Sequence, residues 1–220
     1  MTLRTSRFAR SLPAAALTLA VFAVVGFAGR ASAQGAAGPI ALGTPTPMAD
    51  FKMTTTAGKE VTLAGLKGKK GTLVVFTCNT CPYAKGWEER IVAIGNKAAD
   101  RGVGMIAINS NDPDRVPGDA MVAMQDRAKQ RGIKYAYAAD PGGDVARAFG
   151  ASHTPEAFLF DADGKLVYHG SIDDNVDDAK AVKQTYLANA VADLSSGKAQ
   201  RLAETKAIGC RIKFRQKAGT

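Results

Sequence analysis

GTLVVFTCNTCP is the sequence of residues 71–82, and it joins an apolar run to two cysteines. The β-branched and aromatic residues through Phe76 predict a buried central strand. Cys78 and Cys81 follow, at the point where a helical pattern begins. Free N–H groups and the positive dipole end at a helix N-terminus stabilise a thiolate, the reactive form of cysteine. The stretch therefore predicts a redox pair, in which Cys78 at the helix cap attacks and Cys81, one turn further in, resolves.

Residues 1–33 have the pattern of a secretory signal peptide. Arginines at positions 4, 7 and 10 precede an apolar segment over residues 12–28, and Ala31-Ser32-Ala33 matches a small-residue cleavage site. An uncleaved membrane anchor is the alternative, although the apolar run is short for a membrane span. We expect a periplasmic or secreted protein, exported by a cleavable signal, whose mature chain begins near Gln34.

The charge of the chain gives no indication of a nucleic-acid partner. The formal net charge of +9 falls to +5 when residues 1–33 are removed. The remaining basic residues are scattered, apart from a small cluster over residues 211–217. Nucleic-acid binding needs a basic stripe or a known motif, and the sequence has neither. We expect the cluster to be a solvated chain end, or to make a weak contact with an acidic surface.

The chain has three cysteines, and the third is Cys210. Disulfides persist in exported proteins, so an oxidised pair is compatible with the expected compartment. Three cysteines fit one redox pair and one odd thiol rather than a structural disulfide framework. Two interpretations of Cys210 remain open: a small buried core residue, or a third thiol that a folded-back tail brings to the pair.

Hydrophobic periodicity and turn residues give the order of the expected elements. A linker over residues 34–47 precedes a domain over 48–200 and a C-terminal tail over 201–220. Within the domain we expect an N-terminal β-hairpin over 50–63; strands at 71–77, 103–109, 133–139, 155–161 and 165–170; and helices at 83–101, 119–131, 144–149 and 179–196. This order predicts an α/β fold with a central mixed β-sheet flanked by helices.

Four motifs carry a resemblance to a known family: VFTCNTCPY at 75–83, IAIN at 106–109, HTP at 153–155 with FLFD at 158–161, and GSIDDN at 170–175. Over about residues 40–215 the chain resembles the thioredoxin-like redoxin family, which includes relatives of alkyl hydroperoxide reductase and thiol-specific antioxidant. The resemblance implies a thioredoxin-like fold. It also implies a cis peptide between Thr154 and Pro155 that faces the cysteines and shapes the groove where a partner's cysteine docks. His153 directly precedes this dipeptide, so we expect it in the groove, where its charged form would lower the pKa of Cys78.

Two departures from the family pattern narrow the function. The peroxidase motif Pro-x-x-x-Thr-x-x-Cys fits neither cysteine, because Gly71 and Val75 precede Cys78 at the required positions, and Val74 and Cys78 precede Cys81. The strand before the cysteines also lacks the buried acid of thioredoxin.

The leading interpretation is a thiol–disulfide oxidoreductase that exchanges disulfides with exported proteins. We expect it to use no cofactor or metal, and to depend on a periplasmic or membrane redox partner. One alternative is a copper-binding protein with Cys78, Cys81 and His153 as soft ligands, although copper proteins of this fold have three residues between their cysteines. The other alternative is a thiol-dependent peroxidase.

Overall fold

The computed structural model describes residues 1–3 and 38–216 of the 220-residue chain. Its central strand is β3 (Gly71–Phe76), in which every residue is buried. β3 pairs in parallel with β4 (Val103–Asn109) and antiparallel with β7 (Glu156–Asp161). Because β3 has a strand on each side and packed side chains on both faces, its sequence is a nearly continuous apolar run.

The main sheet has seven strands in the order β2-β1-β5-β4-β3-β7-β8. Parallel pairing joins β3, β4 and β5 (Ala136–Ala139), and the other pairings are antiparallel. β1 (Met53–Thr55) and β2 (Glu60–Val61) form the expected N-terminal hairpin, and β8 (Leu166–Gly170) lies at the opposite edge. A separate two-stranded sheet joins β6 (His153–Thr154) to β9 (Cys210–Arg211). The mixed central sheet predicted from the sequence is confirmed.

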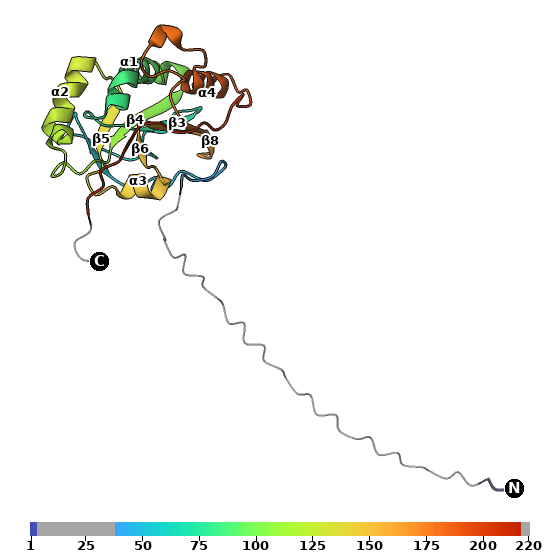
Figure 1. Ribbon diagram of the computed structural model, residues 1–220. Coiled ribbons are helices and arrows are strands. Elements are labelled where there is room, and N and C mark those ends of the chain that lie inside the picture. Colours follow the sequence, from blue (N-terminus) through green and yellow to red (C-terminus); the bar gives the residue numbers. More distant parts are fainter. Residues whose placement is uncertain (4–37, 217–220) are drawn as a thin grey trace. The chain divides into compact units, whose positions relative to one another are not determined.

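Helices cover both faces of the sheet (Figure 1). They are α1 (Pro82–Asn96), α2 (Met121–Arg131), α3 (Asp144–Phe149) and α4 (Tyr186–Ser195), with short 3-10 helices at Ala99–Arg101, Pro117–Asp119 and Ala179–Ala181. Successive side chains of β3 point to opposite faces of the sheet. Leu73 and Val75 pack in a hydrophobic cluster with residues of α1 and α4. Val74 and Phe76 pack in a second cluster with residues of α3. The core therefore has two layers, one on each face of the sheet, and β3 lies between them.

The last helix is shorter than the sequence predicts. A continuous helix over 179–196 is wrong, because α4 begins at Tyr186. The backbone N–H of Lys183 donates to the Asp174 carboxylate, and the Gln184 carbonyl accepts from the Asp174 N–H. These bonds tie residues 183–184 to the loop that carries Asp174, so these two backbone groups do not take part in helical hydrogen bonds. The buried apolar residues of α4 are Leu187, Ala190 and Val191.

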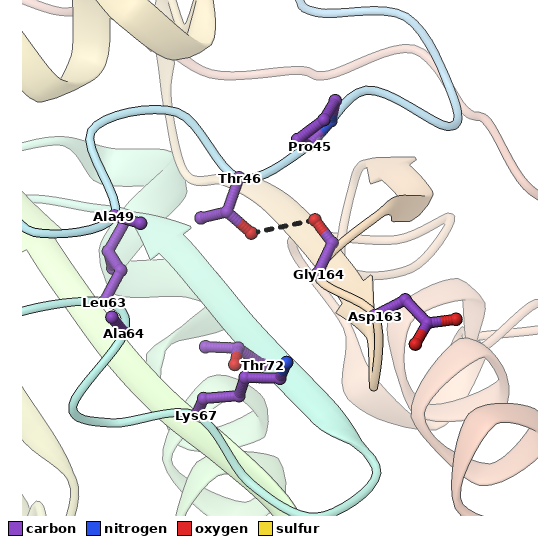
Figure 2. Close-up of a pocket in the computed structure, with 9 residues that line it drawn as sticks. All are labelled: Pro45, Thr46, Ala49, Leu63, Ala64, Lys67, Thr72, Asp163 and Gly164. Atoms are coloured by element: carbon purple, nitrogen blue, oxygen red, sulfur yellow. Dashed lines mark hydrogen bonds between the residues drawn. The ribbon is translucent and has the colours of Figure 1, made fainter.

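The described part of the predicted linker, residues 38–47, lies against the domain. Ile40 N–H donates to the Phe149 carbonyl at 3.1 Å, and Gly43 N–H donates to the Leu166 carbonyl at 2.8 Å. Figure 2 shows the Thr46 hydroxyl bonded to the Gly164 carbonyl, at 3.0 Å, beside a pocket lined also by Thr72. Thr72 is near the start of β3 and the cysteines follow its end, so this pocket lies at the other end of the strand.

The C-terminal tail contacts the domain as far as Arg215, so of the two expectations for the basic cluster the contact with an acidic surface is the one observed. Lys213 N–H donates to Asn111 Oδ1 at 2.7 Å. The Arg215 guanidinium lies 2.8 Å from Asp112 Oδ1 and 2.7 Å from Asp114 Oδ2. Arg215 of the basic cluster therefore forms ion pairs with Asp112 and Asp114 of its own chain.

Residues 4–33 of the predicted signal peptide, and residues 34–37 of the predicted linker, lie outside the described residues. Within 1–3 and 38–216, no helix combines the length and the apolar character needed to cross a membrane.

Candidate active site

Cys78 and Cys81 lie just beyond the C-terminal end of β3, in the turn that leads into α1. Both are free thiols, and both are buried, with 6% and 3% of their surface exposed. Ala84 of α1 packs against them, and the half-buried Cys210 completes the cluster. The structure therefore brings together three cysteines, of which the third is far away in the sequence.

Cys81 is the N-cap residue of α1, and Pro82 is the first helical residue. The side chain of Cys81 makes no cap hydrogen bond, but the backbone of Ala84, in the first turn, lowers the pKa of Cys81. The expectation that Cys78 occupies the cap and Cys81 lies one turn further in is wrong, because the helix starts after Cys81. The positive end of the helix dipole and its free N–H groups therefore act on Cys81 first.

The two thiols lie in one buried cluster and shift each other's pKa in opposite directions. Hydrogen bonding from Cys78 is the largest effect that lowers the pKa of Cys81, to about 4; burial opposes it, and Cys210 and Ala84 reinforce it. Hydrogen bonding to Cys81, together with burial, raises the pKa of Cys78 well above its usual range. These opposite shifts favour one thiolate and one thiol in the reduced pair.

The Thr154–Pro155 peptide bond is cis, as the resemblance implies, and Thr154 contacts both cysteines. Its hydroxyl lies 3.3 Å from Cys78 Sγ, and its carbonyl oxygen lies 3.1 Å from Cys81 Sγ. The Cys81 thiol donates to that carbonyl, which favours the protonated form and opposes the lowered pKa. Cys78, Cys210 and Ala84 act on the pKa of Cys81 in the opposite direction.

Asp119 holds the turn between the two cysteines. Its carboxylate is buried and accepts the Asn79 N–H at 2.6 Å and the Thr80 hydroxyl at 2.8 Å. It also accepts the side-chain amides of Asn109, at 3.1 Å, and Asn111, at 2.8 Å. The sequence predicts a helix that begins at Asp119, but α2 begins at Met121 and its N-cap is Ala120, whose side chain makes no cap bond. Its negative charge contributes to the raised pKa of Cys78.

The ring of His153 does not join the thiols. Its Nδ1 lies 2.8 Å from the Ser152 hydroxyl, and the side chain is half-exposed. Besides burial, the groups that act most strongly on the pKa of Cys78 are Cys81, Thr154 and Asp119. Since the Thr154 hydroxyl faces Cys78, the preceding side chain in an extended strand points to the other side.

Glu156, which follows the cis proline, fixes the loop that carries Thr154. One carboxylate oxygen accepts the backbone N–H groups of Ser152, at 2.9 Å, and His153, at 3.0 Å. The other lies 2.8 Å from Nε2 of His169, and both side chains are buried. The sequence gives Glu156 no role and describes His169 as a strand residue. The acidic residue directly after the Thr-Pro dipeptide, at the start of an apolar strand, could have predicted this role, because a buried carboxylate needs hydrogen-bond donors around it.

Within residues 1–3 and 38–216, no group of three or more His, Cys, Asp and Glu side chains is arranged to hold a metal ion. The ligand set of the copper alternative is also not assembled, because the His153 ring is bonded to Ser152 rather than directed at the cysteines.

Comparison with known proteins supports the fold and the thiol chemistry. The AhpC/TSA family matches residues 44–169. Thiol-disulfide oxidoreductase ResA of Bacillus thuringiensis subsp. konkukian is 28% identical over 118 residues, which are 54% of this chain and 64% of ResA. The chain thus matches less than two thirds of that relative's length.

Two solved structures resemble the protein over most of its length. A hypothetical protein from Sinorhizobium meliloti 1021 has a TM-score of 0.74 and 34% identity, and the match covers 82% of this chain and 97% of the other. An uncharacterized conserved protein from Geobacillus kaustophilus has a TM-score of 0.76 and 32% identity, with 81% and 94% covered. With the family match, these similarities show the thioredoxin-like fold.

The thiolate should titrate on Cys81. Ultraviolet absorbance of the thiolate, followed against pH in the reduced protein, should show a step near pH 4. Cys81→Ser should abolish this step. Cys78→Ser should move it to higher pH, because Cys81 loses its main hydrogen-bond donor. A step that survives in Cys81→Ser and disappears in Cys78→Ser would place the thiolate on Cys78 instead.

Replacing Asp119 should loosen the turn. In Asp119→Asn, an amide nitrogen that can only donate replaces a carboxylate oxygen that accepts hydrogen bonds. We expect the unfolding free energy to fall by about 2 kcal/mol, because buried donors lose their acceptor. The melting temperature should fall by roughly 4–8 °C, and the pKa of Cys78 should fall because a nearby negative charge is removed. Asp126→Asn on the exposed side of α2 is the matched control, with an expected change below about 0.5 kcal/mol. Equal stability of the two variants would show that Asp119 does not hold the turn.

Proposed function

Because the chain belongs to the AhpC/TSA family, we propose that it is a thiol–disulfide oxidoreductase acting on protein thiols and disulfides through Cys78 and Cys81. The observation that carries this proposal is the packing of the two free thiols together at the N-terminus of α1, where both contact the threonine of the cis Thr154–Pro155 peptide. The name of the relative ResA supports the same reaction class. A pair that holds one thiolate and one thiol contains both groups that disulfide exchange needs.

The sequence predicts Cys78 as the attacking sulfur; the cap position and the lowered pKa of Cys81 support Cys81 in that role instead, and the reaction is proposed on this basis. The Cys81 thiolate attacks one sulfur of a partner's disulfide, forms a mixed disulfide and releases the other partner sulfur as a thiolate. The Cys78 thiol then loses its proton and attacks Cys81, so that a Cys78–Cys81 disulfide forms and the second partner sulfur leaves. The released partner sulfurs take up the Cys78 proton and one from solvent. Starting from the oxidised pair, the same steps run in reverse and oxidise a partner dithiol.

Export defines the partners we expect. The signal peptide predicted over residues 1–33 would deliver the chain to the periplasm or beyond, where proteins carry disulfides. The substrates would then be exported proteins with exposed disulfides or thiols. A periplasmic or membrane redox partner would restore the pair after each cycle.

Trapping experiments should identify the attacking sulfur. In the variant Cys78→Ser/Cys210→Ser, Cys81 can attack but no neighbouring thiol can release the partner, so mixed disulfides should accumulate on non-reducing gels and disappear with reductant. The matched variant Cys81→Ser/Cys210→Ser should accumulate none above background. Trapping by the second variant alone would make Cys78 the attacker. Trapping by neither, with soluble folded protein, would contradict the proposed function.

The mature N-terminus should lie near Gln34. Mass spectrometry of the protein recovered from the periplasm or medium of a Gram-negative host should give a chain of about 187 residues. Recovery of material that still contains residues 1–33 from those fractions would contradict the cleavable signal, whatever the outcome of the trapping experiment.

A further inference from the structure

The C-terminal strand β9 pairs directly with the segment that forms the cis proline loop. Thr154 lies opposite Cys210, and His153 lies opposite Arg211, in an antiparallel register. Gly209 lies so close to this loop that a Cβ atom there would be 2.1 Å from the Thr154 carbonyl oxygen. This approach is a backbone-to-backbone contact, in the place where the resemblance puts the docking groove for a partner's cysteine.

Cys210 reaches the redox pair from this strand. It packs in the cluster of Cys78, Cys81 and Ala84, on the strand that pairs with Thr154. Its thiol and its backbone also lower the pKa of Cys81. The odd thiol of the chain therefore lies in the same buried cluster as the redox pair.

Contacts on both sides hold the strand in place. Ile212 N–H donates to the Ser152 carbonyl at 2.9 Å, and Asp112 N–H donates to the Lys213 carbonyl at 2.8 Å. The Phe214 ring lies 4.5 Å from the guanidinium carbon of Arg147, in cation–π geometry. Added to the Arg215 ion pairs, these contacts make β9 a docked element rather than a loose end.

We propose that β9 occupies the groove in which a partner's strand docks, and that Cys210 is a third redox thiol that exchanges a disulfide with Cys81. This inference rests on the proposed function, because the groove has a partner only if the pair reacts with other proteins. Extended segments commonly bind by adding a strand to an exposed strand, with backbone hydrogen bonds supplying affinity and one side chain supplying specificity. β9 has this arrangement within its own chain, with cysteine as that side chain.

The exchange step needs no external oxidant. The Cys210 thiol loses its proton and attacks the Cys81 sulfur of a Cys78–Cys81 disulfide. The Cys81–Cys210 bond forms as the Cys78–Cys81 bond breaks, and the Cys78 sulfur leaves and takes up one proton. One disulfide is consumed and one is made, so the oxidation state of the protein is unchanged while the disulfide moves to the tail. A partner that reacts at Cys81 must then displace β9.

Mild oxidation of Cys78→Ser with diamide tests this step. The variant retains Cys81 and Cys210, and peptide mapping after alkylation should find them joined within one chain. Gly209→Ala in the same background should lower the yield of this disulfide by roughly tenfold or more, because the added Cβ forces β9 away from Thr154. Arg211→Ala is the matched control, since its side chain on the same strand is exposed, and the yield should not change.

Two outcomes separate this inference from the proposed function. If Cys210 stays reduced in Cys78→Ser, or pairs only between chains, while Cys210→Ser still forms a Cys78–Cys81 disulfide, the third-thiol role is overturned and the redox pair stands. If Cys210→Ser forms no Cys78–Cys81 disulfide under the same oxidation, the proposed function fails first. An equal disulfide yield in Gly209→Ala and Arg211→Ala would overturn the role of strand pairing.

Discussion

The buried carboxylate of Asp119 is the constraint on which the site depends. It closes the turn between Cys78 and Cys81 by accepting the Asn79 N–H and the Thr80 hydroxyl. A buried charge is tolerated only when its oxygens are satisfied, and four donors satisfy this one. Because two of them are the side chains of Asn109 and Asn111 at the end of β4, the geometry of the cysteines is fixed by the neighbouring strand as well as by their own.

The same network reaches the tail. Asn111 donates to Asp119 through its amide nitrogen and accepts the Lys213 N–H through its oxygen, so one side chain connects the cysteine turn with the segment that follows β9. On the other side, Thr154 contacts Cys78 and Cys81 and pairs with Cys210. The tail therefore contributes to the site in two ways: it supports the surrounding framework and it places a thiol beside Cys81.

Local patterns in the sequence were sufficient for the fold and for the pair of cysteines. The apolar run through Phe76 marks the central strand because burial on both faces removes polar alternation, and the turn residues mark the hairpins. The cap position was also available, since proline favours the first helical position and Pro82 therefore places the cap on Cys81. The roles of Asp119 and Cys210 were not available, because they depend on contacts 40 and more than 120 residues away from the cysteines along the chain. No local pattern reports such contacts.

The position of Cys210 links the charge of the pair to the docking of the tail. The family match ends at residue 169, so the pair lies within it and β9 lies outside it. Cys210 is nevertheless one of the groups that lower the pKa of Cys81, through its thiol and its backbone N–H. Linkage makes this effect reciprocal: if the docked tail stabilises the thiolate, the thiolate stabilises the docked tail. Because the docked tail lowers the pKa of Cys81, the thiolate stabilises the docked tail. This stabilisation is fully present above the pKa that Cys81 has without the tail, and it is lost as the pH falls to about 4. A Cys81 sulfur that is protonated or joined to a partner carries no charge for Cys210 to stabilise. The first covalent step with a partner therefore weakens the docking of β9, the strand that the partner has to displace.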